Sequence, residues 1–132
     1  MQYANVILIK GDKALMQLRD NKPGLSSAGL WSVPGGNLNK EESPKEAAIR
    51  EFKEETGYNL KNPIFFKKLT YEFIEGNPEV TFFYEKYDGQ QKISCFEGQK
   101  MEFKSLKKLD TLDSFPTHNA LALEAIKKSN NI

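Results

Sequence analysis

A stretch in the middle of the chain, from Ser43 to Gly57, carries both a start signal and a stop signal for an α-helix. The tetrapeptide from Ser43 to Glu46 fits a capping box, with serine at the N-cap, Pro44 at the first helical position and glutamate three residues after the cap. Gly57 is placed to end the helix as a left-handed residue. The spacing predicts a helix from about Pro44 to Thr56, and the rest of the fold must pack around it.

Most of the remaining chain has the β-branched and aromatic composition that is typical of strands. The expected strands are 3–9, 14–18, 31–33, 69–73, 80–87 and 101–103. Gly11 and Asp12 supply the turn between the first two strands, and residues 34–36 end the third. A second helix is expected after Pro116, from the shared face of Leu121, Ala122, Ala125 and Ile126. This order predicts an α/β (α+β) fold, with helices packed on the faces of a mixed sheet.

Composition excludes several classes of protein. The length of 132 residues predicts a single domain over 1–132, and the one cysteine, Cys95, excludes an internal disulfide framework. A net charge of +1 does not indicate binding to bulk nucleic acid or to an anionic membrane. No apolar run reaches the roughly 18–20 residues of a membrane helix, and the first ten residues lack signal-peptide features. We therefore expect a soluble, cytoplasmic protein.

The central helix carries an unusual concentration of carboxylates. Glu51, Glu54 and Glu55 are spaced i, i+3 and i+4, so they project into one sector of the helix, beside the core-facing Ala48, Ile49 and Phe52. Like charges at this spacing repel each other. One explanation is a solvated acidic face, and the other is a site for a hard cation such as Mg²⁺, which takes oxygen ligands.

The sequence around these acids distinguishes the two explanations. From Gly36 to Tyr58 the chain resembles the signature of the Nudix (MutT-like) hydrolases, G-x5-E-x7-R-E-U-x-E-E-x-G-U, where U is a bulky apolar residue. Its fixed positions are filled by Gly36, Glu42, Arg50, Glu51, Glu54, Glu55 and Gly57. Phe52 and Tyr58 fill the U positions, as aromatic rather than aliphatic residues.

The resemblance implies the Nudix α/β/α sandwich and a divalent cation, Mg²⁺ or Mn²⁺, as cofactor. The residues that it assigns to the metal are Gly35, through its carbonyl, with Glu51, Glu54, Glu55 and Glu97. The catalytic assignment falls on Arg50, which would orient the acids, and on the candidate proton acceptors Glu51, Glu54 and Glu97. Gly36, Glu42 and Gly57 would support the box.

Similarity to MutT-type enzymes extends beyond the box. The segment 96–99 looks like their E-G-Q loop, which is why Glu97 joins the metal ligands. The segment 113–119 looks like their D-x-F-P-x-x-N element, which assigns base recognition to Asn119, and Arg19 matches an arginine that also contacts the base. His118 is expected to be a surface or cap residue. The loop 20–30 departs from MutT proper and leaves the substrate open.

The expected reaction is metal-dependent hydrolysis of a diphosphate linkage in a nucleoside diphosphate derivative. A MutT-like enzyme would convert a nucleoside triphosphate to a monophosphate and pyrophosphate. The alternatives are hydrolysis of a nucleotide sugar, ADP-ribose or a dinucleoside polyphosphate, and a non-catalytic regulator that binds a nucleotide. The expected partner is a small nucleotide, with neither a membrane nor bulk nucleic acid, and the expected oligomer is a monomer or homodimer.

Overall fold

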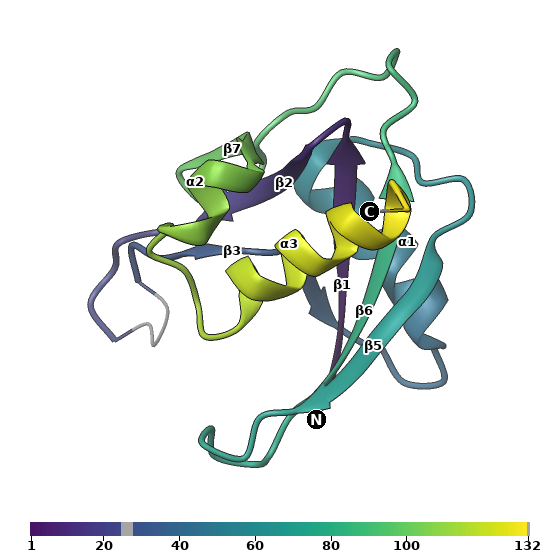
Figure 1. Ribbon diagram of the computed structural model, residues 1–132. Coiled ribbons are helices and arrows are strands. Elements are labelled where there is room, and N and C mark those ends of the chain that lie inside the picture. The colour runs from purple at the N-terminus through teal and green to yellow at the C-terminus, as the bar shows by residue number, and fades with distance from the viewer. Residues whose placement is uncertain (25–27, 132) are drawn as a thin grey trace.

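The computed structural model describes residues 1–24 and 28–131, and its centre is a seven-stranded mixed sheet (Figure 1). The strands are β1 (Gln2–Lys10), β2 (Lys13–Leu18), β3 (Trp31–Ser32), β4 (Gly35–Asn37), β5 (Ile64–Thr70), β6 (Glu79–Lys86) and β7 (Lys100–Ser105). The helices are α1 (Pro44–Thr56), α2 (Leu106–Asp110) and α3 (His118–Ser129). Of the predicted loop 20–30, residues 25–27 lie outside the described residues. No helix in the described ranges is long and apolar enough to cross a membrane.

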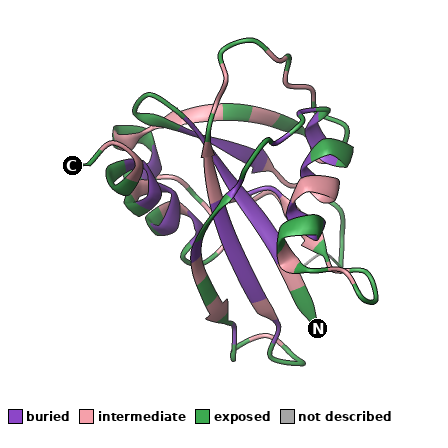
Figure 2. Cartoon of the chain, turned by 90° about the vertical axis from the view of Figure 1, so that its right-hand side faces the viewer, coloured by how far each residue is buried: buried purple, intermediate pink, exposed green. Residues whose placement is uncertain are grey.

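Strand β1 lies at the centre of the sheet. It pairs in parallel with β6 and antiparallel with β2 and β4, and the main strand order is β3-β2-β1-β6-β5. Residues 4–9 are all buried, because both faces of this strand are covered. Figure 2 shows the resulting band of buried residues through the middle of the sheet. The mixed sheet predicted from the order of elements is confirmed.

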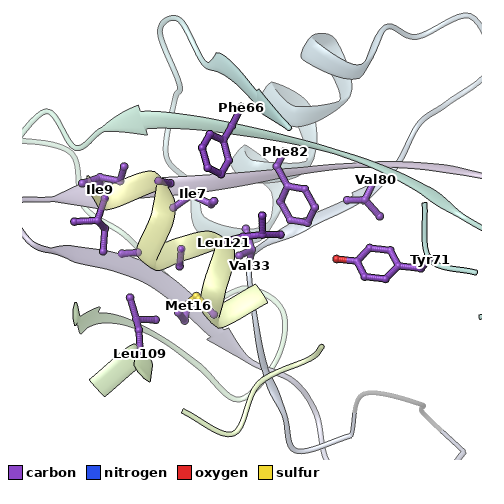
Figure 3. Packing of buried hydrophobic residues seen from close by; sticks show 14 residues of the cluster. Ile7, Ile9, Met16, Val33, Phe66, Tyr71, Val80, Phe82, Leu109 and Leu121 are labelled. Atoms are coloured by element: carbon purple, nitrogen blue, oxygen red, sulfur yellow. The ribbon is translucent and has the colours of Figure 1, made fainter. Parts of the chain in front are cut away.

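The two faces of the sheet bury two separate clusters, because successive side chains of a strand point to opposite faces. Val6 and Leu8 of β1 pack with Phe52 of α1 on one face. Ile7 and Ile9 join the cluster covered by α3 on the other face, which Figure 3 shows from close by. In Figure 1, α3 crosses in front of the strands and α1 lies behind them. The architecture is therefore the α/β/α sandwich that the resemblance implied.

Helix α1 begins and ends where the local signals predict. The side chain of Ser43 accepts a hydrogen bond from the backbone N–H of Glu46, and the Glu46 side chain accepts one from the backbone N–H of Ser43. Gly57 has φ of 77° and donates its N–H to the Lys53 carbonyl, as the C-terminal cap requires. The helix that presents the acidic residues is thus fixed by its own sequence.

Three elements differ from the sequence-based expectation. The strand predicted over 69–73 is instead β5, which ends at Thr70 because the chain turns there, with the Tyr71 N–H bonded to the Pro78 carbonyl at 3.0 Å. Residues 35–37 do not merely end a strand but form β4 against β1. Helix α2, capped by the Ser105 side chain, is too short to show a helical period in the sequence.

Candidate active site

A cavity of about 550 Å³ opens between the sheet, α1 and the N-terminus of α3. Its charged and small lining residues are Arg19, Gly35, Gly36, Glu51 and Glu97. Its apolar and aromatic lining residues are Tyr3, Val33, Tyr71, Ile74, Pro78, Val80 and Phe115, and the rings of Tyr71, Phe115 and His118 pack against one another. A second hollow of about 200 Å³ shares Arg19 and Glu97 with the first, so the two spaces adjoin there, and we call this region the acidic end of the cavity.

The glycine pair of β4 is required by close packing. A side chain at Gly36 would overlap the carboxylate of Glu51, and one at Gly35 would overlap the Asn5 side chain and the Ala4 carbonyl. Only glycine allows the strand to approach α1 and β1 this closely. Both glycines line the cavity, where the resemblance had placed the Gly35 carbonyl in a metal shell.

The three carboxylates of α1 do not share one environment. Glu51 lines the cavity with its side chain 18% exposed, the Glu54 side chain is 58% exposed, and Glu55 is buried at 1%. At about 100° per residue, these positions span a sector roughly 100° wide. One edge of that sector faces the sheet and the other faces solvent. The expected single acidic stripe is therefore split between core, cavity and surface.

Arg50 holds one of these carboxylates in place. Its guanidinium donates two hydrogen bonds to Glu42, at 2.7 and 2.8 Å, one to Glu51 at 2.9 Å and one to the Asn37 carbonyl at 2.9 Å. The Arg50 hydrogen bond, with the backbone N–H of Asn39, lowers the pKa of Glu42 to about 2. Arg50 is not among the described residues that line the cavity. The geometry is that of a positioning residue, in keeping with the expectation that Arg50 orients the acids.

Glu55 is a buried carboxyl group without a hydrogen-bond partner among the described residues, at either oxygen. Burial, followed by the charges of Glu97 and Glu51, raises its pKa to about 8. Nearby, the Gln17 side-chain amide donates to the backbone carbonyl of Glu97 at 2.8 Å, which ties the 97 loop to β2. Three carboxyl groups, those of Glu51, Glu55 and Glu97, are therefore close enough together for two of them to raise the pKa of the buried one.

These residues fit a hard divalent cation. Within the described ranges, no three His, Cys, Asp or Glu side chains are grouped closely enough to hold a metal alone. Mg²⁺ does not need such a cage, because it commonly keeps several waters and shares its other sites between one or two carboxylates and substrate phosphates. Glu51 and Glu97 at the cavity, with the unpartnered oxygens of Glu55 behind them, offer that donor set.

The residues assigned to base recognition are placed differently from one another. Arg19 lines the cavity, as expected. Asn119 is not one of the described lining residues, and its side-chain amide donates to the Leu109 carbonyl at 3.3 Å. His118, expected at the surface, is buried at 5% and lines the cavity. This expectation was wrong, and the missed signal is the spacing of three and four residues before Leu121 and Ala122, which puts His118 on the same helical face as they are.

The sandwich fold with its acid-lined cavity can be compared with models of known protein families. A model of the NUDIX domain matches residues 2–127. The chain belongs to the Nudix family, whose members are hydrolases that act on the pyrophosphate bonds of small nucleotides and generally use a divalent metal.

Two curated relatives match most of the chain. The 8-oxo-dGTP diphosphatase of Escherichia coli (strain K12) is 33% identical over 102 residues, which cover 76% of this chain and 77% of the relative. The uncharacterized Nudix hydrolase YvcI of Bacillus subtilis (strain 168) is 29% identical over 121 residues, which cover 87% and 72%. The protein is thus a Nudix hydrolase with a relative named as a diphosphatase.

Solved structures share the fold at lower identity. The MutT protein from Methanosarcina mazei Go1 has a TM-score of 0.79 and 22% identity, over 100% of this chain and 96% of that one. An Ap4A hydrolase from C. elegans has a TM-score of 0.78 and 18% identity, over 98% and 99%. The NUDIX domain of Shewanella oneidensis NrtR, complexed with ADP ribose, has a TM-score of 0.77 and 16% identity, over 99% and 86%.

Proposed function

We propose that the protein hydrolyses a nucleoside triphosphate from the cytoplasmic pool to a monophosphate and pyrophosphate, with Mg²⁺ as its cofactor. The single observation that carries this proposal is the cavity of about 550 Å³, which is lined both by carboxylates and by a cluster of mutually packed rings. A nucleotide has the same division, because its phosphates are anionic and its base is a flat apolar surface. The relative named 8-oxo-dGTP diphosphatase supports a triphosphate as substrate.

The chain's own residues supply positioning and proton transfer. A divalent cation, when bound, would neutralise phosphate oxygens and lower the pKa of a bound water. Glu51 is a ligand for it whose carboxylate is fixed by Arg50, and Glu55 adds buried oxygens that lack any other described partner. Arg19 provides a positive charge at the same end of the cavity.

Glu97 is the favoured proton acceptor among the three candidates. Glu51 and Glu97 line the cavity, whereas Glu54 is mostly exposed outside it. Glu51 already accepts a hydrogen bond from Arg50 at 2.9 Å, so one of its two oxygens is occupied. Glu97 lies on a loop held by Gln17 through its backbone, so its side chain remains available to the attacking water.

The direct test is a panel of ordinary and oxidised nucleoside triphosphates with Mg²⁺ or Mn²⁺, in which monophosphate and pyrophosphate are both quantified. We expect equal amounts of the two products, and loss of turnover in Glu51→Gln and Glu97→Gln with unchanged thermal melting. Release of inorganic phosphate in place of pyrophosphate, or full activity in both variants, would contradict the proposal.

A second candidate is a substrate with a group beyond the diphosphate, such as a nucleotide sugar, ADP-ribose or a dinucleoside polyphosphate. The second hollow favours it, because this space is lined by Arg19 and Lys22 and shares Glu97 with the main cavity. The same panel with these compounds separates the two activities by their products. Nucleotide binding without any product, with either metal, would instead indicate a regulator.

A further inference from the structure

We propose that His118 selects the nucleobase, as a fixed hydrogen-bond donor to a keto oxygen at the aromatic part of the cavity. This inference rests on the proposed function, since it concerns the base of the same nucleotide. It moves base recognition from Asn119, whose amide is bonded to the Leu109 carbonyl, to the neighbouring residue.

The orientation of the imidazole is set by one backbone group. The N–H of Val33 donates to Nδ1 of His118 at 2.9 Å. A backbone N–H can only donate, so Nδ1 must be the unprotonated nitrogen. In the neutral ring the proton is then carried by Nε2.

Nε2 is left with no hydrogen-bond partner among the residues that the structure describes, and the ring lines the cavity. The other sides of the ring are covered by aromatic rings. Phe82 meets it edge-on, with ring centroids 5.4 Å apart, and the Phe115 and Tyr71 centroids are 5.0 and 6.4 Å away. The donor therefore belongs to a buried ring whose position is determined by packing.

Protonation does not change this donor near neutral pH. Burial, followed by the charge of Arg19, lowers the pKa of His118 to about 3. The imidazole is neutral throughout the physiological range, so Nε2 remains a donor and never becomes an acceptor there. A substrate atom that faces it must accept a hydrogen bond.

Two other polar groups beside Val33 complete the recognition surface. The Asn5 side-chain amide donates to the Val33 carbonyl at 3.2 Å, which leaves its own oxygen as an acceptor at the cavity. The Ser32 hydroxyl is buried without a partner among the described residues, and Ser32 also lines the cavity. The Nε2 donor and the Asn5 acceptor belong to residues that are bonded to the two sides of Val33 and line the same cavity, and a lactam edge, in which a ring N–H adjoins a keto oxygen, offers the matching pair of groups. This favours 6-oxopurines over 6-aminopurines.

The test compares two triphosphates that differ at this edge, inosine triphosphate and adenosine triphosphate, with wild type, His118→Asn and His118→Gln. Asparagine places an amide where Nδ1 lies, so it retains an acceptor for the Val33 N–H but removes the cavity donor. Glutamine reaches the position of Nε2 and retains a donor there, but it leaves the Val33 N–H without its partner. The two variants therefore separate the two roles of the ring.

We expect wild type to prefer the 6-oxopurine in kcat/KM by about tenfold or more, since a site built to hydrogen-bond one group rejects analogues that lack it. His118→Asn should melt near the wild-type temperature and lose this preference, mainly through KM for the 6-oxopurine. His118→Gln should melt at a lower temperature and keep part of the preference.

The outcomes that overturn the inference are distinct from those that overturn the proposed function. If folded His118→Asn keeps the wild-type preference, His118 has only a structural role. If Asn119→Ala loses the preference while His118→Asn keeps it, the base is read by Asn119. If wild type cleaves neither triphosphate nor any other compound of the panel above, the proposed function itself fails.

Discussion

Replacement of Glu55 by glutamine tests the electrostatics of the candidate metal site without relying on activity. Burial and two neighbouring carboxylates raise the pKa of Glu55 from 4.5 to about 8. Without metal, and between about pH 4.5 and about pH 8, the folded protein therefore keeps a proton on the Glu55 carboxyl group that the unfolded chain has lost. This proton linkage stabilises the fold fully below about pH 4.5, and the contribution disappears as the pH rises through about 8.

The magnitude follows from the same two values. A difference between 4.5 and about 8 corresponds to a total of about 5 kcal/mol, and about 2.5–3 kcal/mol of it is lost between about pH 6 and about pH 9. The glutamine of Glu55→Gln does not titrate. In the presence of a chelator, wild type should therefore lose this much more unfolding free energy than Glu55→Gln over that pH interval.

Urea unfolding at the two pH values measures the difference, with Glu54→Gln as the matched control, because that side chain is 58% exposed. The control should retain the wild-type pH dependence. Added Mg²⁺ should restore the stability of wild type at the higher pH, and have a smaller effect on Glu55→Gln, since a cation that binds the folded state stabilises it. Parallel curves for wild type and Glu55→Gln would show that Glu55 ionises freely, and would refute the reasoning.

Three further perturbations follow from the same contacts. Gly36→Ala should reduce kcat by about 10–100-fold in a steady-state assay, because its methyl group displaces the Glu51 carboxylate; activity near wild type would show that this approach is not needed. Arg50→Lys cannot make the paired bonds to Glu42, so both kcat and the melting temperature should fall, and an unchanged kcat would mean that Glu51 needs no positioning. Burial lowers the pKa of His118, so its contribution to the free energy of unfolding is lost as the pH falls from 6.5 towards about 3. Between about pH 7.5 and about pH 5, wild type should therefore lose about 2 kcal/mol more unfolding free energy in urea than His118→Asn does. Equal losses in the two proteins would contradict the burial of a neutral ring.

Local chemistry explains why some of the fold could be predicted from the sequence. The capping box at Ser43 and the left-handed Gly57 act within a few residues, so both ends of α1 could be predicted to the residue. Helix α2 and strand β4 could not be predicted, because they are too short to show a helical or strand-like repeat of apolar residues. The fold of β4 depends on pairing with β1, whose residues lie about thirty positions earlier.

The candidate site shows the same limit. The box motif placed Glu51, Glu54 and Glu55 on one helix, but which of them faces the core depends on how α1 is rotated against the sheet. His118 was expected at the surface or as a cap but is buried, and its partner Val33 is 85 positions away. That contact arises only when β3 and α3 meet, so it carries no local signal.

The two ends of the cavity are connected through one short segment of chain. Val33 fixes His118 and Asn5 by its N–H and carbonyl, and Gly36, three residues later, determines how closely Glu51 approaches. Between them, the Pro34 carbonyl accepts the Val6 N–H at 2.9 Å, which attaches the segment to the central strand. The proposed base contact and the proposed phosphate site are therefore positioned by the same backbone segment. A change in the path of residues 33–36 should alter base preference and kcat together, whereas changes at His118 or at Glu51 alone should alter only one of them.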